Sequence, residues 1–120
     1  MLKTRIAVFV SGGGTNFEAL INAEENGKIP HGEIVLVLSS NKDAYALKRA
    51  ENHGIKSVVC SKKELGSQEN FEREILKNLE ENDIQLIVLA GFMSILSKEF
   101  TKKYENRIIN VHPSLIPSFC

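Results

Sequence analysis

The chain has 120 residues, of which 42% are hydrophobic and 25% are charged, a composition typical of one globular domain with a modest core. Fifteen basic and fifteen acidic side chains cancel, so the net charge gives no support to a nucleic-acid groove or an anionic membrane surface as a partner. Two cysteines without CxxC spacing indicate neither a zinc site nor a disulfide framework, and no run reaches the roughly twenty apolar residues of a membrane helix. We therefore expect a cytoplasmic protein with reduced thiols and no metal.

Five apolar stretches predict β-strands. Their residues are largely β-branched and do not alternate with polar ones, which is typical of strands covered on both faces in a parallel sheet. The stretches comprise residues 6–10, 34–38, 55–60, 84–90 and 108–111.

Helical spacing appears between these strands. Thr15 and Glu18 form a capping-box signature for the first helix, and Gly27 is expected to end it. His53 lies at the expected end of the second helix, where a cationic side chain favours the helix dipole. The later helices are indicated by the spacing of Ala44, Leu47 and Ala50 before Gly54, by a cap at Ser67, and by a start at Ser97.

The alternation of strands and helices predicts a doubly wound, mostly parallel α/β sheet of the Rossmann type, with helices on both faces and one domain over residues 1–120. In such sheets ligands bind outside the carboxyl ends of the strands. The chemically unusual stretches SGGGTN, SSN, AGFM and NVH all follow predicted strands. Their shared position predicts a site at this edge.

The glycine turn SGGGTN, residues 11–16, joins the first strand to the first helix. Glycines permit close approach of a ligand, and a helix N-terminus favours an anion, so Gly14, Thr15 and Asn16 are candidates for binding a phosphate. A tight turn without a ligand fits the same residues. There is no GxGxxG, because Phe17 occupies the third glycine position, and no Walker lysine, so a phosphate monoester fits better than a dinucleotide.

Asn110 and His112 follow the last strand at a spacing of two residues. A histidine at a strand end can act as general acid or base, and an asparagine amide on the same side can donate to a carbonyl oxygen that gains charge. Pro113 biases His112 away from helical conformation. The pair suggests acyl transfer, although a structural histidine beside an asparagine turn fits the spacing equally.

The segments NVHPSLIP, SGGGTN and LAGFMSILS together resemble the glycinamide ribonucleotide formyltransferases along essentially the whole chain. Methionyl-tRNA formyltransferases carry HGSLLP and formyltetrahydrofolate deformylases carry HHSFLP at the place of HPSLIP. The resemblance implies transfer of a formyl group from 10-formyltetrahydrofolate to the amine of glycinamide ribonucleotide in de novo purine biosynthesis, without a metal or a covalent enzyme intermediate.

The resemblance also implies roles for single residues. Asn110 is expected to hold the formyl oxygen, His112 to shuttle a proton, and Gly14, Thr15 and Asn16 to bind the ribonucleotide's phosphate. The implied folate pocket comprises Met93, Ser94, Ile95, Leu96, Gln68 and Asn110.

Two of these pocket residues depart from the family pattern. Ser94 stands where many members have arginine, and Gln68 stands where an arginine sometimes contacts folate. Pro113 is expected near the substrate.

Relatives continue past HPSLIPSF, so the resemblance implies that this chain is an N-terminal portion. It would contain the whole phosphate-binding turn of Gly14, Thr15 and Asn16, called the phosphate seat below, but only part of the catalytic residues. The sequence does not decide whether the protein forms a homodimer. Two alternatives are also open. One is a deformylase that uses water in place of the amine, whose members usually carry a regulatory domain before the first strand. The other is a non-catalytic phosphate-binding fragment.

Overall fold

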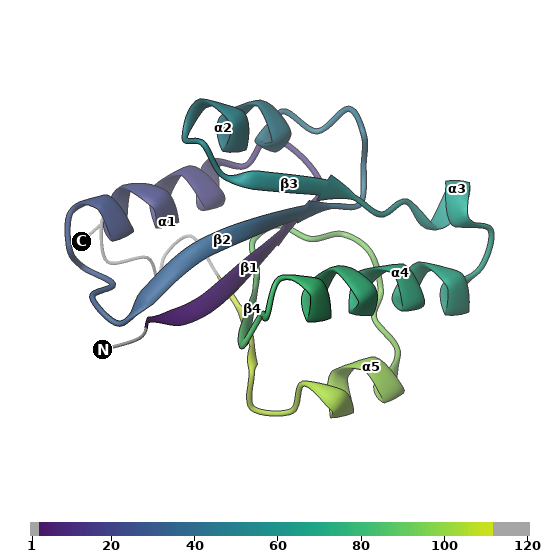
Figure 1. Cartoon of the computed structure of the whole chain (residues 1–120). Helices are drawn as coiled ribbons and strands as arrows, with labels where there is room; N and C mark the ends of the chain where they lie inside the picture. The colour runs from purple at the N-terminus through teal and green to yellow at the C-terminus, as the bar shows by residue number, and fades with distance from the viewer. Residues whose placement is uncertain (1–2, 112–120) are drawn as a thin grey trace.

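The computed structural model describes residues 3–111, which form a central sheet between two layers of helices (Figure 1). The strands are β1 (Thr4–Val10), β2 (Gly32–Ser39), β3 (Lys56–Val59), β4 (Leu86–Leu89) and β5 (Ile108–Asn110). The helices are α1 (Thr15–Glu25), α2 (Ala46–Asn52), α3 (Lys62–Leu65), α4 (Gln68–Glu81) and α5 (Lys98–Lys103). All five predicted strands are confirmed, with each end within two residues of its expected position.

The sheet has the strand order β3-β2-β1-β4-β5, and every neighbouring pair is parallel. This arrangement confirms the predicted doubly wound α/β class. The strand order reverses between β1 and β4, because the chain first builds outward through β2 and β3 and then returns to the other side of β1. Ligand sites of such folds lie at this switch point, at the carboxyl ends of the strands.

Both faces of the sheet are buried, which explains why the strand sequences do not alternate. Successive side chains of β1 point to opposite faces, so Val8 and Val10 pack under α1 and α2, whereas Phe9 packs against α4 and α5. The first layer is anchored by Phe17, Ile21, Ala46 and Ala50. The second layer is anchored by Phe71, Ile75, Leu79 and Phe100.

Several predicted helix ends are confirmed by their local geometry. Ser67 and Ser97 cap α4 and α5, each accepting a hydrogen bond at its hydroxyl from a backbone N–H of the first turn, at 3.1 and 3.2 Å. Gly27 and Gly54 follow α1 and α2 with φ of 75° and 69°, the left-handed conformation that ends a helix.

One prediction about helices was wrong, and one short helix was not predicted. Thr15 does not cap α1, because Gly14 occupies the N-cap position and no side chain accepts a hydrogen bond there. The Glu18 carboxylate is instead drawn to α2 by Arg49 and His53. The short helix α3 was missed, although Ser61 and Glu64 form the same capping signature, and the Ser61 hydroxyl does accept from the Glu64 N–H.

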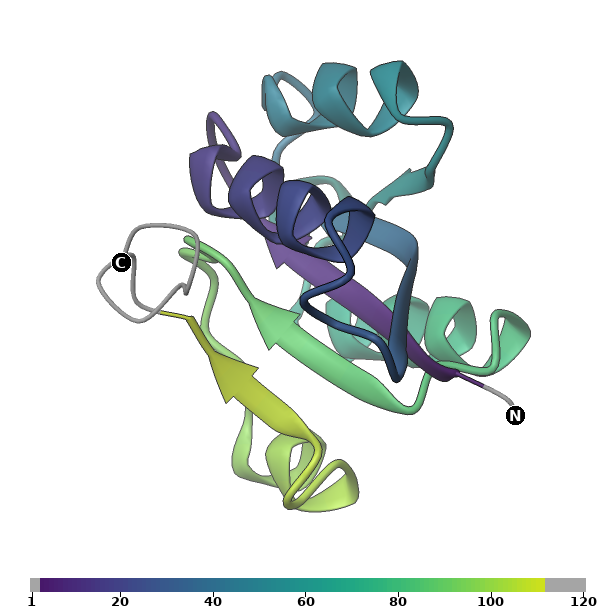
Figure 2. The same cartoon turned by 90° about the vertical axis from the view of Figure 1, so that its left-hand side faces the viewer.

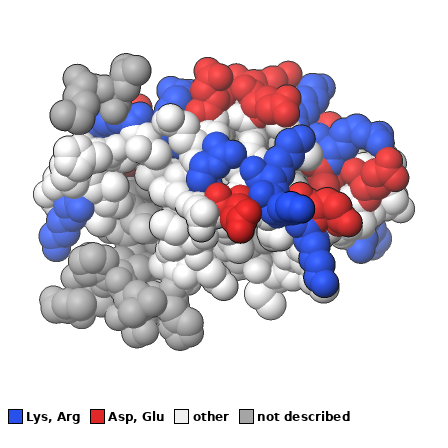
Figure 3. All heavy atoms as spheres, turned by 90° about the horizontal axis from the view of Figure 1, so that it is seen from below, with Lys and Arg blue, Asp and Glu red and all other residues white. Residues whose placement is uncertain are grey.

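Charge is mixed on the face that carries α5 and α4, where basic and acidic side chains stand next to one another (Figure 3).

Across residues 3–111, no helix is both long and apolar enough to span a bilayer. The same described residues contain no group of three or more His, Cys, Asp or Glu side chains that could bind a metal ion. Burial, followed by the charge of Glu74, raises the pKa of the Cys60 thiol to about 11.

Candidate functional site

The carboxyl ends of β1, β4 and β5 lie at the same level of the sheet, where the three strands point the same way in Figure 2. Phe9 pairs with Leu89, and Leu89 pairs with Asn110, so these residues form one row across the switch point. The Val111 N–H donates to the Leu89 carbonyl at 2.9 Å, which keeps the chain on β4 beyond the end of β5. Asn110 is thereby level with Phe9, one residue before β1 ends, although β4 lies between the two strands. The glycine turn begins just past the end of β1.

Ser11 joins three of the four loops at this edge. Its hydroxyl oxygen accepts a hydrogen bond from the Met93 N–H at 2.8 Å and shares a second one of 2.5 Å with the Ser40 hydroxyl. These residues follow β1, β4 and β2 respectively. The structure therefore brings together the stretches SGGGTN, SSN and AGFM, as predicted, and Ser11 is a connecting residue that sequence reasoning missed.

Gly14 is the glycine of this turn that requires the absence of a side chain. Its φ is 81°, and a Cβ built on it would lie 2.6 Å from the Cβ of Ala46 in α2. Gly12 and Gly13 differ, because a Cβ on either would meet nothing within 4 Å. The turn is thus pressed against α2 on one side and open on the other.

The open side of the turn carries unpaired donors. Within residues 3–111, no acceptor is found for the backbone N–H groups of Gly13, Gly14, Thr15 or Asn16, whereas the Gly14 carbonyl accepts from the Glu18 N–H at 2.8 Å. Thr15 is exposed and Asn16 is half-buried. Unpaired N–H groups at the positive end of an 11-residue helix suit an anion, which agrees with the phosphate seat expected from the sequence.

The loop after β4 presents apolar side chains to the solvent. Met93 and Ile95 are 83% and 80% exposed, while Ser94 and Leu96 are half-buried. Phe92 anchors the loop, since its ring meets Phe9 edge-on at 5.2 Å between centroids. Exposed Met and Ile side chains beside polar loops suit the apolar part of a small ligand.

Gln68 holds this loop from α4. Its amide donates to the Ile95 carbonyl at 2.9 Å and to Glu72 at 2.6 Å. Glu72 in turn accepts from the N–H and the hydroxyl of Ser97, both at 2.6 Å. Partial burial by itself raises the pKa of Glu72, but the bonds from Ser97 and Gln68 outweigh it and lower the pKa. Glu72 is a supporting residue that the sequence did not single out.

His112 and Pro113 lie outside the described residues, so their roles remain predictions. Asn110 is exposed at the carboxyl edge, a position in which its amide is open to a ligand. Of the remaining predicted site residues, the phosphate group lies after β1, the loop residues lie after β4, and Gln68 begins the helix beneath that loop.

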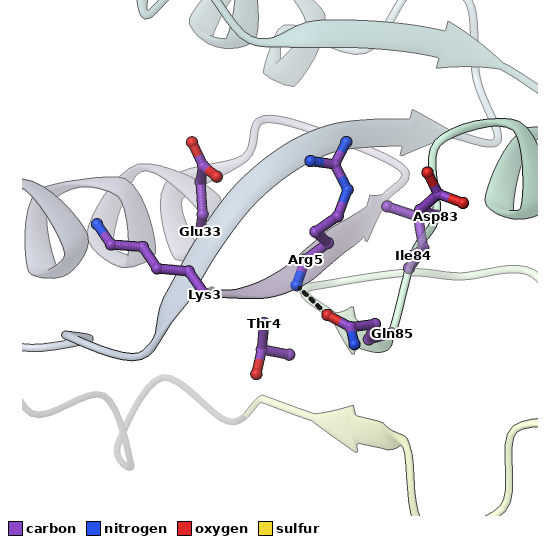
Figure 4. A pocket seen from close by; sticks show the side chains of 7 residues that line it. All are labelled: Lys3, Thr4, Arg5, Glu33, Asp83, Ile84 and Gln85. Carbon is purple, nitrogen blue, oxygen red and sulfur yellow. Dashed lines mark hydrogen bonds between the residues drawn. The ribbon is translucent and has the colours of Figure 1, made fainter. Parts of the chain in front are cut away.

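A hollow of about 550 Å³ lies at the opposite end of the sheet, where the strands begin (Figure 4). Its lining includes Arg5, Asp83 and Gln85, at the amino ends of β1 and β4. The Arg5 backbone N–H donates to the Gln85 side chain at 3.0 Å, and its Nε donates to the Asn82 carbonyl at 2.9 Å. These polar groups close the turn before β4, so the carboxyl edge remains the candidate site.

The fold and the site define a doubly wound α/β protein whose carboxyl edge carries an exposed asparagine and backbone N–H groups that have no acceptor within residues 3–111. Residues 4–120 match the family described as formyl transferase, and the chain therefore belongs to that family.

Individual relatives are consistent with membership of this family. The chain is 47% identical over 117 residues to the trifunctional purine biosynthetic protein adenosine-3 of Gallus gallus, covering 98% of this chain and 12% of that protein. It is 43% identical to the solved phosphoribosylglycinamide formyltransferase of Brucella melitensis, with a TM-score of 0.87 over 98% of this chain and 60% of that one. Glycinamide ribonucleotide transformylase 1 of Geobacillus kaustophilus has 37% identity and the same TM-score, over 98% and 62%. The chain thus spans about three fifths of these solved relatives.

Proposed function

We propose that this chain takes part in the transfer of a formyl group from 10-formyltetrahydrofolate to the amine of glycinamide ribonucleotide, a step of purine biosynthesis. The observation that carries the proposal is that the glycine turn after β1 and Asn110 at the end of β5 both lie at the carboxyl edge of the sheet. The relatives at 37–47% identity support it, because their names state this substrate or this pathway.

In this proposal the N–H groups of Gly14, Thr15 and Asn16, for which the described residues offer no acceptor, bind the ribonucleotide's phosphate. The backbone of residues 93–96 and the side chains of Met93 and Ile95 contact the folate, and Gln68 supports that loop. Two substrates fixed on neighbouring loops of one edge meet in an orientation that favours reaction.

The proposed chemistry is a nucleophilic addition followed by elimination. The substrate amine forms a bond to the formyl carbon, and the electron pair of the C=O bond moves to oxygen. The Asn110 amide donates a hydrogen bond to that oxyanion. When the intermediate collapses, the bond to the folate nitrogen breaks, and His112 transfers the proton from the attacking amine to the departing nitrogen.

A formyl-transfer assay of the protein with both substrates tests this function. We expect His112→Ala to lower the rate about 100-fold or more, because general acid–base catalysis contributes that much, and Asn110→Ala to lower it about 100-fold. Binding of the ribonucleotide, measured by calorimetry, should remain nearly unchanged in both. His31→Ala is the matched control, since His31 is exposed in the turn before β2.

The assay also separates the two alternatives. Formate released without the ribonucleotide would identify a deformylase that uses water. Ribonucleotide binding without turnover would mean a phosphate-binding module and would contradict the catalytic proposal. Equal loss of binding and turnover in His112→Ala would show that His112 has a structural role.

A further inference from the structure

Helix α2 holds the carbonyl groups of the glycine turn. The Ala46 N–H donates to the Gly12 carbonyl at 3.1 Å, and the Arg49 Nε donates to the Gly13 carbonyl at 2.7 Å. Both donors belong to α2, which lies more than thirty residues further along the chain. Two consecutive carbonyls of the turn therefore face the same helix.

The direction of these carbonyls sets the direction of the N–H groups. In a planar trans peptide the C=O and the N–H point to opposite sides. The Gly12 carbonyl shares its peptide with the Gly13 N–H, and the Gly13 carbonyl shares its peptide with the Gly14 N–H. Because α2 holds the carbonyls, both N–H groups point away from α2, and neither has an acceptor within the described residues 3–111.

Arg49 is itself fixed by other contacts. Its Nη1 donates to Glu18 at 3.2 Å, and its guanidinium carbon lies 5.0 Å from the centre of the Tyr45 ring. His53 holds the other oxygen of Glu18 at 2.7 Å. The Arg49 side chain is only 25% exposed, and its Nε and Nη1 both donate to groups of the protein.

We propose that Arg49 is a positioning residue for the phosphate seat: by holding the Gly13 carbonyl against α2, it aims the Gly14 N–H at the phosphate of the substrate. Glu18 and Tyr45 keep the guanidinium in place. This inference rests on the proposed function, because the seat has a ligand only if the turn binds the ribonucleotide.

The test compares glycinamide ribonucleotide with the corresponding riboside that lacks the phosphate, in calorimetric titrations of the protein and its variants. We expect Arg49→Met and Arg49→Lys each to lower ribonucleotide affinity about ten-fold, because a hydrogen bond to the charged phosphate is misdirected. Riboside affinity should change less than about two-fold, since it does not use the seat. Arg73→Met is the matched control, because Arg73 pairs with Glu69 at 2.8 Å on the exposed side of α4.

The Arg49→Lys variant distinguishes a positioning role from a purely electrostatic one. Lysine keeps the positive charge but lacks the Nε–H group that donates to the Gly13 carbonyl. Full ribonucleotide affinity in Arg49→Lys would overturn the proposal and assign Arg49 a purely electrostatic role. Should Arg49→Met fail to fold in thermal unfolding, Arg49→Lys decides the question by the same comparison. A wild-type protein that binds ribonucleotide and riboside equally would instead refute the phosphate seat, and with it the proposed function.

Discussion

Glu18 lies between two cationic partners of α2. It accepts from Arg49 at 3.2 Å and meets His53 Nε2 at 2.7 Å, while His53 Nδ1 lies 3.3 Å from Glu25. The hydrogen bond to Glu18 raises the pKa of His53, with partial burial opposing it and Glu25 adding to it. Partial burial by itself raises the pKa of Glu18, but His53 and Arg49 outweigh it and lower the pKa. The charged forms of both residues therefore join α1 to α2.

The pKa directions predict a pH window for this contact. A raised His53 pKa gives stability that is complete below the unfolded value of 6.5 and is lost as pH rises through the higher folded value. A lowered Glu18 pKa gives stability that is present above 4.5 and is lost as pH falls through the folded value. Thermal unfolding should show the largest Tm difference between wild type and His53→Gln near about pH 6, shrinking by about pH 8.5.

His31→Gln serves as the control for this pH series, because His31 is exposed in a turn. Its Tm difference from wild type should not depend on pH. A His53→Gln difference that stays constant over the same range would show that the histidine contributes by packing rather than by charge.

The site residues predicted from the sequence differ in kind from those that only the structure points to. Gly14, Thr15 and Asn16 belong to a local motif, and their place at the start of α1 follows from the adjoining strand and helix. Ser11 and Arg49 act on groups 82 and 36 residues away in the chain. No local pattern records such a contact, because it exists only once the strands have paired.

At the scale of elements, α4 and the loop after β4 behave as one unit. Glu72 accepts from the N–H and the hydroxyl of Ser97, and Gln68 reaches the Ile95 carbonyl, so α4 holds the loop at both of these positions. The Ser97 hydroxyl also caps α5 by accepting from the Phe100 N–H. The position of the proposed folate-binding loop thus depends on a carboxylate beneath it.

We expect Glu72→Ala to release this loop. Loss of the two bonds to Ser97 should lower the free energy of unfolding by about 1–3 kcal/mol and weaken folate binding while leaving ribonucleotide binding unchanged. Denaturant unfolding and amide hydrogen exchange of residues 91–97 measure the two effects. Glu69→Ala is the matched control, because Glu69 is an exposed residue of the same helix. Unchanged exchange in Glu72→Ala would show that the loop is held by its apolar contacts alone.

The sequence predicted strands and helices correctly where the pattern of buried residues determines the type of element. The apolar runs that became β1 and β2 are covered on both faces, and the spacing of Phe71, Ile75 and Leu79 gives α4 one buried face. Tertiary contacts decided the remaining cases. Thr15 does not form the predicted cap because Gly14 occupies the N-cap position and Glu18 bonds to Arg49, whereas Ser61 does cap α3.

At the scale of the whole molecule, the strand order was not predictable from the sequence. Patterns identify the strands, but β1 and β4 pair across about eighty residues, and only packing decides which strands become neighbours. One result of this order is that β5 forms an edge of the sheet within residues 3–111. Ile109 is 49% exposed there, and its side chain lines an apolar hollow of about 210 Å³ together with Val88, Val111 and Leu20.

Within the described part of the chain, β5 has a neighbouring strand on one side only, and apolar surface lies beside its open backbone groups. Such an edge predicts association between copies of the 120-residue polypeptide. We expect sedimentation velocity to show concentration-dependent association that Ile109→Lys reduces, because the added charge disfavours burial of β5. Val59→Lys is the matched comparison, since Val59 is 39% exposed on β3 at the other edge of the sheet and is absent from the lining of the hollow. Loss of association in Val59→Lys but not in Ile109→Lys would place the contact on β3 and contradict the prediction for β5.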